Sequence, residues 1–522
     1  MKKRVYLIVV VLALGCLFAP VLVSAPGDSL RHKPADFSDA DRSKKVMTTS
    51  AAVDAMFKDY MESRHMPGLV YGIVLDGELL YSGQFGFANL EAQIPADVKS
   101  LFRIASMSKS FTALAILQLR DAGKLSLDDP ASKYLPEMKK LKYLTTDAPE
   151  ITIRHLLTHG AGFPEDNPWG DRQLADSDAE LMQLVADGIS FSNVPGVAYE
   201  YSNLGFALLG QIVQKVSGME FQHYTTEHIF KPLGMHATVW EYEKAPEAHL
   251  ALGYQWIDDA YQNIPLEHHG SFGAMGGLIT SIEDFANYMA LHLSAWPPRS
   301  DDDTGPLKRS SLREMHHPWR FAALMDQYRF PNGRECAAVR AYAYGLSWTR
   351  DCDGKVYIGH SGGLPGFGSN WTIMPEYGLG VMSFDNRTYG GTSTMNLAVL
   401  DTIVTLAGLE PRTLPTSDIL EKRKNALVKI LPEWKGAETS GLFAENFFMD
   451  NRLQDVVKRT QELYDEAGAI HHVGPMVPMN QLRGTFTLEG EKKNILVFFT
   501  LTPEKEPLIQ QVRMRAVEKK AE

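Results

Sequence analysis

The amino-acid sequence predicts an α+β protein in which helices flank an antiparallel sheet, with a second, smaller α+β unit at the C-terminal end. The first observation is the order of the patterns. Strand-like segments come first, many helical segments follow, and strand-like segments then return, an order in which terminal strands usually share one sheet. The second observation is a change of pattern after about Leu409, where a stretch rich in Pro, Thr and Ser resembles a linker. The helical segments between the two sets of strands are expected to form a large helical subdomain.

Length and composition are those of a large globular protein. At ~100–200 residues per domain, the 522 residues suggest two to four units. The hydrophobic (44%) and charged (22%) fractions exclude wholesale disorder. A formal charge of -11 without a basic tract argues against a nucleic-acid partner. Three cysteines are too few for a disulfide scaffold or a Cys-rich metal site. Length and composition therefore leave a large globular protein, most often an enzyme.

The first 25 residues have the pattern of an export signal. Basic residues at positions 2–4 precede a mostly apolar run from Val5 to Val23, and small residues allow cleavage after Ala25. The alternative is a retained N-terminal membrane anchor, because the run approaches the ~20 residues that span a bilayer. We expect a periplasmic or secreted protein. An oxidising compartment would let Cys336 and Cys352 pair, the alternative being two buried free thiols.

The first expected elements follow residues 26–49, a polar stretch that we interpret as a flexible lead-in. A helical pattern of apolar residues covers about 52–64. Leu69–Leu75 and Leu79–Tyr81 are predicted to be strands joined by a tight Asp76-Gly77 turn, because Asp-Gly suits a two-residue hairpin loop.

Two later segments are apolar on nearly every side, and we therefore predict buried helices. The first covers Ser106–Ala122 and stops at Gly123; the second covers about Leu204–Val216 and stops at Gly218. Thr280–Asp284 has the spacing of a capping box before another helix. Strands are predicted to return at Tyr344–Thr349, Lys355–Ile358, Asn370–Met374 and Leu379–Phe384.

These segments define the expected domains. We place the main domain at residues 50–408, a linker at 409–418 and an accessory α+β domain at 419–522. The accessory domain is predicted to have helices up to about Ala467 and strands near Leu482–Leu488, Ile495–Leu501 and Leu508–Val517. It resembles, weakly, small cystatin-like or nuclear-transport-factor-like modules. Whether it covers an active site, mediates dimerisation or binds a partner stays open.

Ser106 and Lys109 are three residues apart at the start of the first buried helix, which places both side chains on one face. A serine hydroxyl becomes a strong nucleophile when a nearby base takes its proton, and burial can lower the pKa of a lysine enough to make it that base. Backbone N–H groups at a helix start would stabilise a developing oxyanion. This Ser-x-x-Lys is the only one in the chain, although a surface lysine beside a hydroxyl is the plainer interpretation of such a pair.

Tyr-x-Asn occurs twice. Tyr201-Ser202-Asn203 directly precedes the second buried helix, whereas the copy beginning at Tyr261 lies in a polar stretch that we interpret as a loop. A tyrosine near a lysine can carry a proton to a leaving group, and an amide beside it can orient the lysine and the substrate. We therefore select Tyr201 and Asn203 as site residues, against the alternative of a core tyrosine.

His360-Ser361-Gly362 follows a predicted strand and opens a glycine-rich segment, whereas two other His-x-Gly sequences, at 268–270 and 472–474, lack such a context. Glycine lets a backbone approach a ligand closely. We expect an edge strand that binds an acyl chain, with His360 and Gly362 lining the site and the Gly363 N–H stabilising an oxyanion. The alternative is a tight hairpin with an incidental histidine.

In this order, Ser-x-x-Lys, Tyr-x-Asn and His-x-Gly resemble the motifs of the serine β-lactamase and penicillin-binding protein superfamily, in its class C-like branch. Flanking segments resemble the same family: Phe102–Ala105, Ile153–Gly160, Lys231–Met235 and Gly359–Gly363. The resemblance covers roughly residues 50–405. It implies a β-lactamase/transpeptidase-like fold and a reaction that needs no cofactor and no metal.

The resemblance also implies a role for each motif residue. Ser106 would be the acylated nucleophile, Lys109 would help to activate it, and Tyr201 would act as general acid and base. Asn203 would position the substrate amide, and His360 would line the pocket. The oxyanion hole would combine the backbone N–H of the serine with that of the third motif.

The third motif departs from true β-lactamases, which carry lysine where this chain has His360. A lysine is a fixed positive charge suited to the carboxylate of a β-lactam, whereas a histidine is only partly charged near neutral pH. The sequence therefore favours a hydrolase that cleaves an ester or amide through an acyl-serine, similar to the family's esterases, D-aminopeptidases and D-stereospecific peptidases. The alternatives are a low-activity β-lactamase and a non-enzymatic binder of cell-wall peptides.

His155 and His159 are interpreted as structural and not catalytic. The paired histidines at 268–269, 316–317 and 471–472 have no His-x-x-x-His or carboxylate pattern, so we expect no metal site. The acyl and leaving groups have no readable signal, because loops such as 160–195 and 295–340 are expected to shape the pocket.

Overall fold

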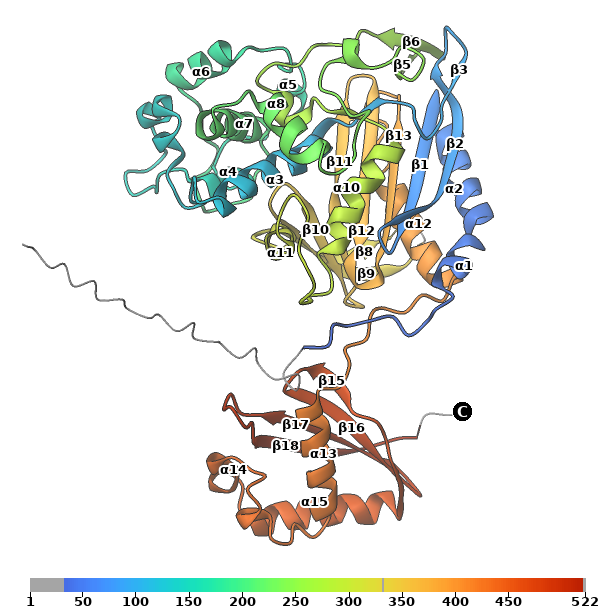
Figure 1. The fold of residues 1–522 in the computed structure, drawn as a ribbon, viewed down its shortest axis with the longest axis vertical. Coiled ribbons are helices and arrows are strands. Elements are labelled where there is room, and N and C mark those ends of the chain that lie inside the picture. The colour runs from blue at the N-terminus through green and yellow to red at the C-terminus, as the bar shows by residue number, and fades with distance from the viewer. Residues whose placement is uncertain (1–31, 331–332, 520–522) are drawn as a thin grey trace, which may run out of the picture. The chain divides into compact units, whose positions relative to one another are not determined.

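The computed structural model describes residues 32–330 and 333–519, which divide into two compact units (Figure 1): residues 34–414, and residues 415–519 together with residues 32 and 33. In these described ranges the hydrophobic clusters of one unit include no residue of the other. The expected signal peptide, residues 1–25, lies outside the described residues. Within them, we find no helix of the length and apolar character needed to cross a bilayer.

A nine-stranded antiparallel sheet organises the larger unit, in the order β3-β2-β1-β13-β12-β11-β10-β9-β8. β1 pairs with β13, with Ile73 opposite Val381, so strands from the two ends of this unit share one sheet, as predicted. The strands are β1 (Gly68–Leu75), β2 (Glu78–Asn89), β3 (Ile94–Pro95), β8 (Arg320–Arg329), β9 (Glu335–Tyr342), β10 (Ser347–Asp351), β11 (Val356–Leu364), β12 (Phe367–Met374) and β13 (Leu379–Asp385).

Helices cover both faces of this sheet (Figure 1). α10 (Ile282–Ser294) packs against β1, β2 and β13, while α12 (Ser393–Leu406) packs against β12, β13 and α2 (Ser50–Ser63). Alternate side chains of β1 therefore enter different cores: Val70 and Val74 join the cluster on one face, and Tyr71 and Ile73 the cluster on the other. Every residue of β1 is buried as a result.

The helical subdomain lies between β3 and α10 in sequence. Its two predicted central helices are present, because α3 and α7 are buried along most of their length and pack against each other and against α9. α7 ends at Gly218 in the left-handed conformation, as the sequence predicted. Ser281 caps α10 by accepting from the Asp284 N–H, which is one half of the capping box that the sequence predicted. The helices of this region are α3 (Ser108–Asp121), α4 (Ile153–Leu157), α5 (Asn167–Gly170), α6 (Asp178–Asp187), α7 (Asn203–Ser217), α8 (Phe221–Thr225) and α9 (Gly273–Gly276). The region also contains two small two-stranded sheets. One pairs β4 (Phe102–Arg103) with β7 (Ile279–Thr280), and the other pairs β5 (Gly253–Ile257) with β6 (Ala260–Ile264).

Residues 34–49 of the expected flexible lead-in and residues 409–414 of the expected linker belong instead to the larger unit, while residues 26–31 lie outside the described residues. Arg42, in α1 (Arg42–Met47), is only 5% exposed; it forms an ion pair with Asp76 and lies over the ring of Phe37. Asp36 and Thr413 exchange two backbone hydrogen bonds of 3.0 and 2.9 Å. The expectation failed because the acceptors and rings that hold these polar residues come from distant parts of the sequence.

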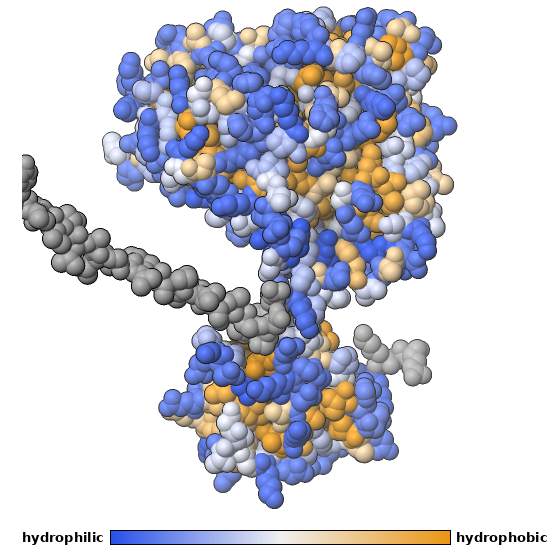
Figure 2. Space-filling view, viewed as in Figure 1, coloured by the Kyte–Doolittle hydropathy of each residue, from blue (hydrophilic) through white to orange (hydrophobic). Residues whose placement is uncertain are grey.

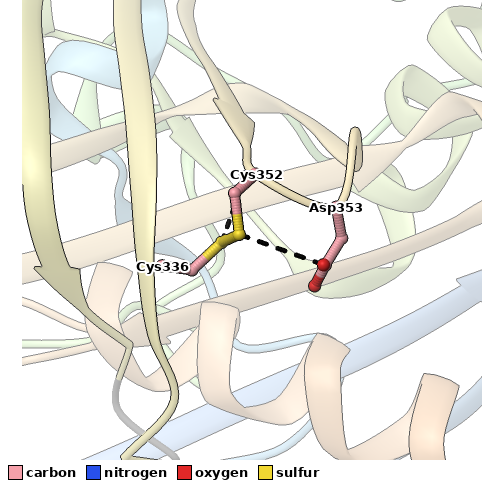
Figure 3. A group of neighbouring side chains, drawn as sticks. All are labelled: Cys336, Cys352 and Asp353. Carbon is pink, nitrogen blue, oxygen red and sulfur yellow. Dashed lines mark hydrogen bonds between the residues drawn. A yellow bond between two sulfur atoms is a disulfide. The ribbon is translucent and has the colours of Figure 1, made fainter.

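The segment 295–340, expected to be a loop, contains α11 (Arg309–Met315) and the strands β8 and β9 that extend the sheet. Likewise, Tyr261 lies in strand β6 and not in a loop. Cys336 at the start of β9 and Cys352 just after β10 form a disulfide (Figure 3), which resolves the alternative that the sequence left open.

The C-terminal unit is also α+β. Its sheet has the order β14-β16-β17-β18, with β15 paired to β16, so β18 is an edge strand. Side chains of β17 alternate between buried and partly exposed, which places Ile495, Val497 and Phe499 in the core of the unit. In the view of Figure 2 the surface of each unit is mainly hydrophilic, with smaller apolar patches among the hydrophilic residues. The elements are α13 (Asp418–Ile430), α14 (Glu445–Asp450), α15 (Leu453–Ala467), β14 (Ile470–Val473), β15 (Val477–Asn480), β16 (Arg483–Gly490), β17 (Asn494–Leu501) and β18 (Ile509–Val517).

Candidate active site

Ser106 and Lys109 lie where the buried helices meet the sheet. Ser106 is in a short 3-10 turn, Ala105–Met107, that precedes α3 and contacts β11 and β12. Ala105 has a φ of 48°, in the left-handed region that costs a residue with a side chain about 1–3 kcal/mol. Such strain is typical of functional sites. Lys109 lies one turn on, and its Nζ donates to Ser106 Oγ at 2.9 Å.

Lys109 is completely buried and uses all its hydrogen-bond donors. Besides Ser106 Oγ, its Nζ contacts Asn203 Oδ1 at 2.6 Å and the Met275 carbonyl at 3.0 Å. Burial lowers the pKa of Lys109 to about 7, while the carboxyls of Asp171 and Asp166 act in the opposite direction. Near neutral pH a substantial fraction of this lysine is therefore uncharged and able to accept a proton.

Tyr201 faces the same group. Its ring centroid lies 4.9 Å from Lys109 Nζ and 4.3 Å from that of His159. Burial raises the pKa of Tyr201 well above its usual value, and a hydrogen bond with Ser106 opposes this shift only partly. Tyr201 therefore stays a phenol at neutral pH and can serve as a proton donor.

Asn203 is held in place at the first turn of α7. Its Oδ1 accepts from Lys109, and its Nδ2 donates to Asn167 Oδ1 at 3.2 Å. Asp166 accepts the backbone N–H groups of Asn203 and Leu204 at 2.6 and 2.9 Å, which satisfies donors that a helix start leaves free.

Asp171 is a second buried acid beside the lysine. It accepts a hydrogen bond from the hydroxyl of Tyr389 at 3.0 Å. Burial raises the pKa of Asp171 to about 6, with Lys109 acting in the opposite direction. The site therefore combines one buried amine with two nearby carboxyls, Asp166 and Asp171.

His360 is 4% exposed, and both of its ring nitrogens have partners. Nδ1 lies 2.6 Å from the Ser361 carbonyl and must donate to it, so Nε2 accepts from the Tyr342 hydroxyl at 2.9 Å. Burial lowers the pKa of His360 to about 3, with a further contribution from Lys109. The sequence led us to expect a partly charged histidine, whereas burial makes it neutral at physiological pH.

Gly362 and Gly363 bring β11 next to the serine. A Cβ on Gly362 would lie 2.2 Å from the Ile104 carbonyl oxygen and 2.4 Å from Ser369 Oγ, so only glycine fits there. β10 pairs with β11 as far as Gly359, and residues 360–364 pair with β12 alone in the described part of the sheet. β11 is thus an inner strand whose last residues have an open edge, in place of the edge strand that we expected.

His155 and His159, which we interpreted as structural, both have partners in the fold. His155 forms a capping box with Thr152 at the start of α4. His159 Nδ1 accepts the backbone N–H of Ser202 at 3.0 Å, and its ring packs against Tyr201.

Sequence reasoning missed four groups of this site: the carboxyls of Asp166 and Asp171, the carbonyl of Met275 and the hydroxyl of Tyr342. No spacing or motif marks any of them. Each reaches the site through a hydrogen bond or charge interaction with a motif residue that is distant in sequence.

Two groups of possible metal ligands occur among the described residues. Cys336, Cys352 and Asp353 form one, but the two sulfur atoms are joined in the disulfide of Figure 3. Glu241, Glu243 and His268 form the other, with His268 Nδ1 3.0 Å from Glu241 Oε2. No metal-ligand spacing marks this histidine in the sequence, because both glutamates come from an earlier segment.

Comparisons with known proteins agree with this geometry. A family model described as Beta-lactamase matches residues 53–403. Beta-lactamase-like protein 2 of Dictyostelium discoideum is 34% identical over 260 residues, 48% of this chain and 47% of that protein. Protein flp of Staphylococcus aureus (strain MW2) is 28% identical over 349 residues, 65% of this chain and 63% of that protein. The chain thus spans between about half and two thirds of these relatives.

Two solved structures have a similar fold. The octameric penicillin-binding protein homologue from Pyrococcus abyssi has a TM-score of 0.57 and 21% identity, covering 90% of this chain and 91% of its own. A penicillin-binding protein from Bacillus halodurans has a TM-score of 0.52 and 25% identity, covering 67% of this chain and 98% of its own. With the family match over most of the larger unit, these likenesses show that the chain belongs to the β-lactamase family and shares the fold of penicillin-binding proteins.

Proposed function

We propose that this protein is an exported serine hydrolase that cleaves an ester or amide bond, in a small ester or a D-amino acid peptide, through an acyl-Ser106 intermediate. Membership of a family of serine hydrolases supports the general chemistry. The observation that carries the proposal is the buried Lys109, whose pKa is lowered to about 7 and whose Nζ lies 2.9 Å from Ser106 Oγ.

The geometry supports the following steps. Neutral Lys109 takes the Ser106 proton while Oγ attacks the substrate carbonyl carbon, and the negative charge on the carbonyl oxygen is stabilised by the backbone N–H groups of Ser106 and Gly363. As the carbonyl re-forms, the bond to the leaving group breaks and Tyr201 gives that group a proton, which Lys109 replaces. Water then attacks the acyl carbon while its proton passes through the Tyr201 hydroxyl to neutral Lys109. As the carbonyl re-forms, the bond between the acyl carbon and Ser106 Oγ breaks, Lys109 returns the proton to Oγ, and the acid product leaves.

The neutral His360–Tyr342 pair favours particular substrates. Because both nitrogens of His360 are engaged and the ring is uncharged, His360 itself offers no cation to a carboxylate of the substrate. This supports esters and amides that lack such a group over β-lactams, whose carboxylate needs a positive charge.

Active-site labelling tests the proposal. We expect a fluorophosphonate to modify Ser106, and both labelling and turnover to disappear in Ser106→Ala. Ser110→Ala is the matched control, because Ser110 is buried on the same helix and its hydroxyl donates only to the Met107 carbonyl among the bonds described. Turnover that persists in Ser106→Ala, with no adduct at this serine, would contradict the proposal.

A substrate panel distinguishes the reaction classes. We expect short-chain esters or D-amino acid amides to be hydrolysed faster than nitrocefin. His360→Lys should raise nitrocefin hydrolysis relative to ester hydrolysis, because it supplies the missing cation. A wild-type protein that prefers nitrocefin would identify a β-lactamase, and one that binds D-amino acid peptides without turnover would identify a binding protein.

A further inference from the structure

A second group of titratable side chains in the larger unit has no part in the proposed hydrolase chemistry. Glu241, Glu243 and His268 each offer one ligand atom, and these three atoms lie within 4.8 Å of one another. His268 Nδ1 is 3.0 Å from Glu241 Oε2, and His268 Nε2 is 3.4 Å from Glu243 Oε1. The three side chains are 30–60% exposed, so an ordinary surface ion pair would explain these contacts.

His269, the next residue, is not explained in this way. Its side chain is only 1% exposed, and its Nε2 faces Glu241 Oε1 at 3.8 Å, too far for a hydrogen bond. Neither of its ring nitrogens has a hydrogen-bond partner among the described residues, although a buried polar atom without one destabilises a fold. Burial lowers the pKa of His269 to about 3, so the ring is neutral, which is the form that binds a metal ion.

The fold holds the ring of His269 in place. A Cβ on Gly277 would lie 2.8 Å from His269 Cγ, and one on Gly273 would lie 3.3 Å from His269 Cδ2, so the ring packs directly on α9 and the glycine after it. The indole of Trp240 also contacts it, with ring centroids 5.6 Å apart. The ring therefore has little room to turn, and a ligand for Nε2 has to enter beside Glu241.

The four groups have the separations that a zinc ion needs. Their nitrogen–oxygen distances are 3.0, 3.4 and 3.8 Å, and ligand atoms around tetrahedral zinc, at bond lengths of about 2.0–2.2 Å, lie ~3.4 Å apart. His268 can bind one ion through only one of its nitrogens. Because its side chain is 60% exposed, the ring can turn toward the ion, whereas His269 is already fixed.

The charges around this group also suit a cation. Arg103 and Lys244 are the cations whose charge acts on the two histidines. The guanidinium of Arg103 is already engaged, because it donates to the backbone carbonyl of Glu267 at 2.7 Å. The carboxylates of Glu241, Glu243 and Glu267 outnumber the two cations, so a divalent ion would meet a net negative charge.

We propose that Glu241, Glu243, His268 and His269 bind one Zn²⁺ ion. Two imidazole nitrogens and two carboxylate oxygens suit zinc, whereas Mg²⁺ and Ca²⁺ prefer sites made of oxygen alone. The ion would join the segment 241–243 to the residues that pack on α9. None of the four ligands belongs to the Ser106 site, so the proposal does not depend on the hydrolase reaction.

Calorimetric titration of the full chain with zinc chloride, near neutral pH and in a buffer that does not bind zinc, tests the proposal. We expect one saturable site per chain. Glu241→Gln and His268→Ala should each weaken binding about tenfold or more, because each removes a ligand. His236→Ala and Glu247→Gln replace exposed residues outside the group; they are the matched controls and should leave the affinity unchanged.

His269→Gln separates a zinc site from a surface ion pair. It should weaken binding about tenfold or more, because the ion pair does not need the buried imidazole and the zinc ion does. Circular dichroism shows whether this variant is folded; if it is not, the variants of Glu241 and His268 decide. No saturable zinc site, unchanged affinity in Glu241→Gln, His268→Ala or a folded His269→Gln, or equally tight binding of Mg²⁺ would each overturn the proposal.

Discussion

The pKa of Lys109 depends on two opposing influences: burial lowers it, and the carboxyls of Asp171 and Asp166 raise it. The base is therefore tuned by residues that do not contact Ser106. Complete burial with no acid nearby would lower the pKa further, so the amine would stay uncharged down to a lower pH. Full exposure would leave the pKa high and keep the amine charged at neutral pH.

Asp171→Asn should therefore shift the pH profile of the reaction. Removing a carboxylate that raises the pKa of Lys109 lets that pKa fall further, so the acid limb of kcat/KM moves to lower pH. The measurement is kcat/KM against pH for both proteins. Asp187→Asn, on the exposed end of α6, is the control and should leave the limb in place. A limb that stays fixed or rises in Asp171→Asn would show that Lys109 is not the titrating base.

At this scale the sequence predicted the residues to which we assign the proposed reaction, but not those that adjust their pKa values. Ser106 and Lys109, and likewise Tyr201 and Asn203, were found because a short spacing joins each pair at the start of a predicted buried helix. Tyr342 could not be found in this way, because its hydroxyl reaches His360 only after β9, β10 and β11 have paired. The same holds for the charge of His360, which depends on burial and not on residue type.

Strand β11 is the element that closes the site. Its approach to the Ala105–Met107 turn depends on Gly362, which has no room for a side chain between the Ile104 carbonyl and Ser369. The Ser369 hydroxyl also donates to that carbonyl at 2.8 Å, which fixes β12 to the same turn.

Gly362→Ala should consequently separate β11 from the serine and lower turnover. A displacement near 1 Å at a reacting group can cost about 100-fold in rate, and we expect an effect of this order. Gly205→Ala is the control: this buried glycine of α7 would give its new Cβ ordinary contacts of 3.8 Å, so activity should be retained. Ester hydrolysis and circular dichroism together measure both effects, and full activity in Gly362→Ala would mean that β11 does not form part of the site.

The sequence predicted elements with a clear period and missed those without one. α3 and α7 were recognised because they are apolar on nearly every side. β8 was not recognised, because two irregularities in its pairing with β9 interrupt the alternation of its side chains. Most residues of β8 are partly or fully exposed, so no apolar period was available.

For the whole molecule, the separate cores predict that the two units unfold in separate transitions. Reduction of the Cys336–Cys352 disulfide should lower the Tm of one transition only, because both cysteines lie in the larger unit. A loop of this size contributes about 3 kcal/mol in the chain-entropy account. Scanning calorimetry with and without reductant measures this.

The control for that measurement is the chain with both Cys336→Ser and Cys352→Ser, in which reductant should change neither transition. A single transition that moves as a whole on reduction would show that the two units unfold together.

The paired backbones of Asp36 and Thr413 bring the two ends of the larger unit side by side. The chain therefore enters and leaves this unit at neighbouring positions, so residues 34–414 form a closed cassette. In evolutionary terms such a cassette can be gained, lost or exchanged as a single insertion without cutting a core. For an engineer, the same closure makes this unit a natural candidate for circular permutation, with new termini opened at an exposed turn.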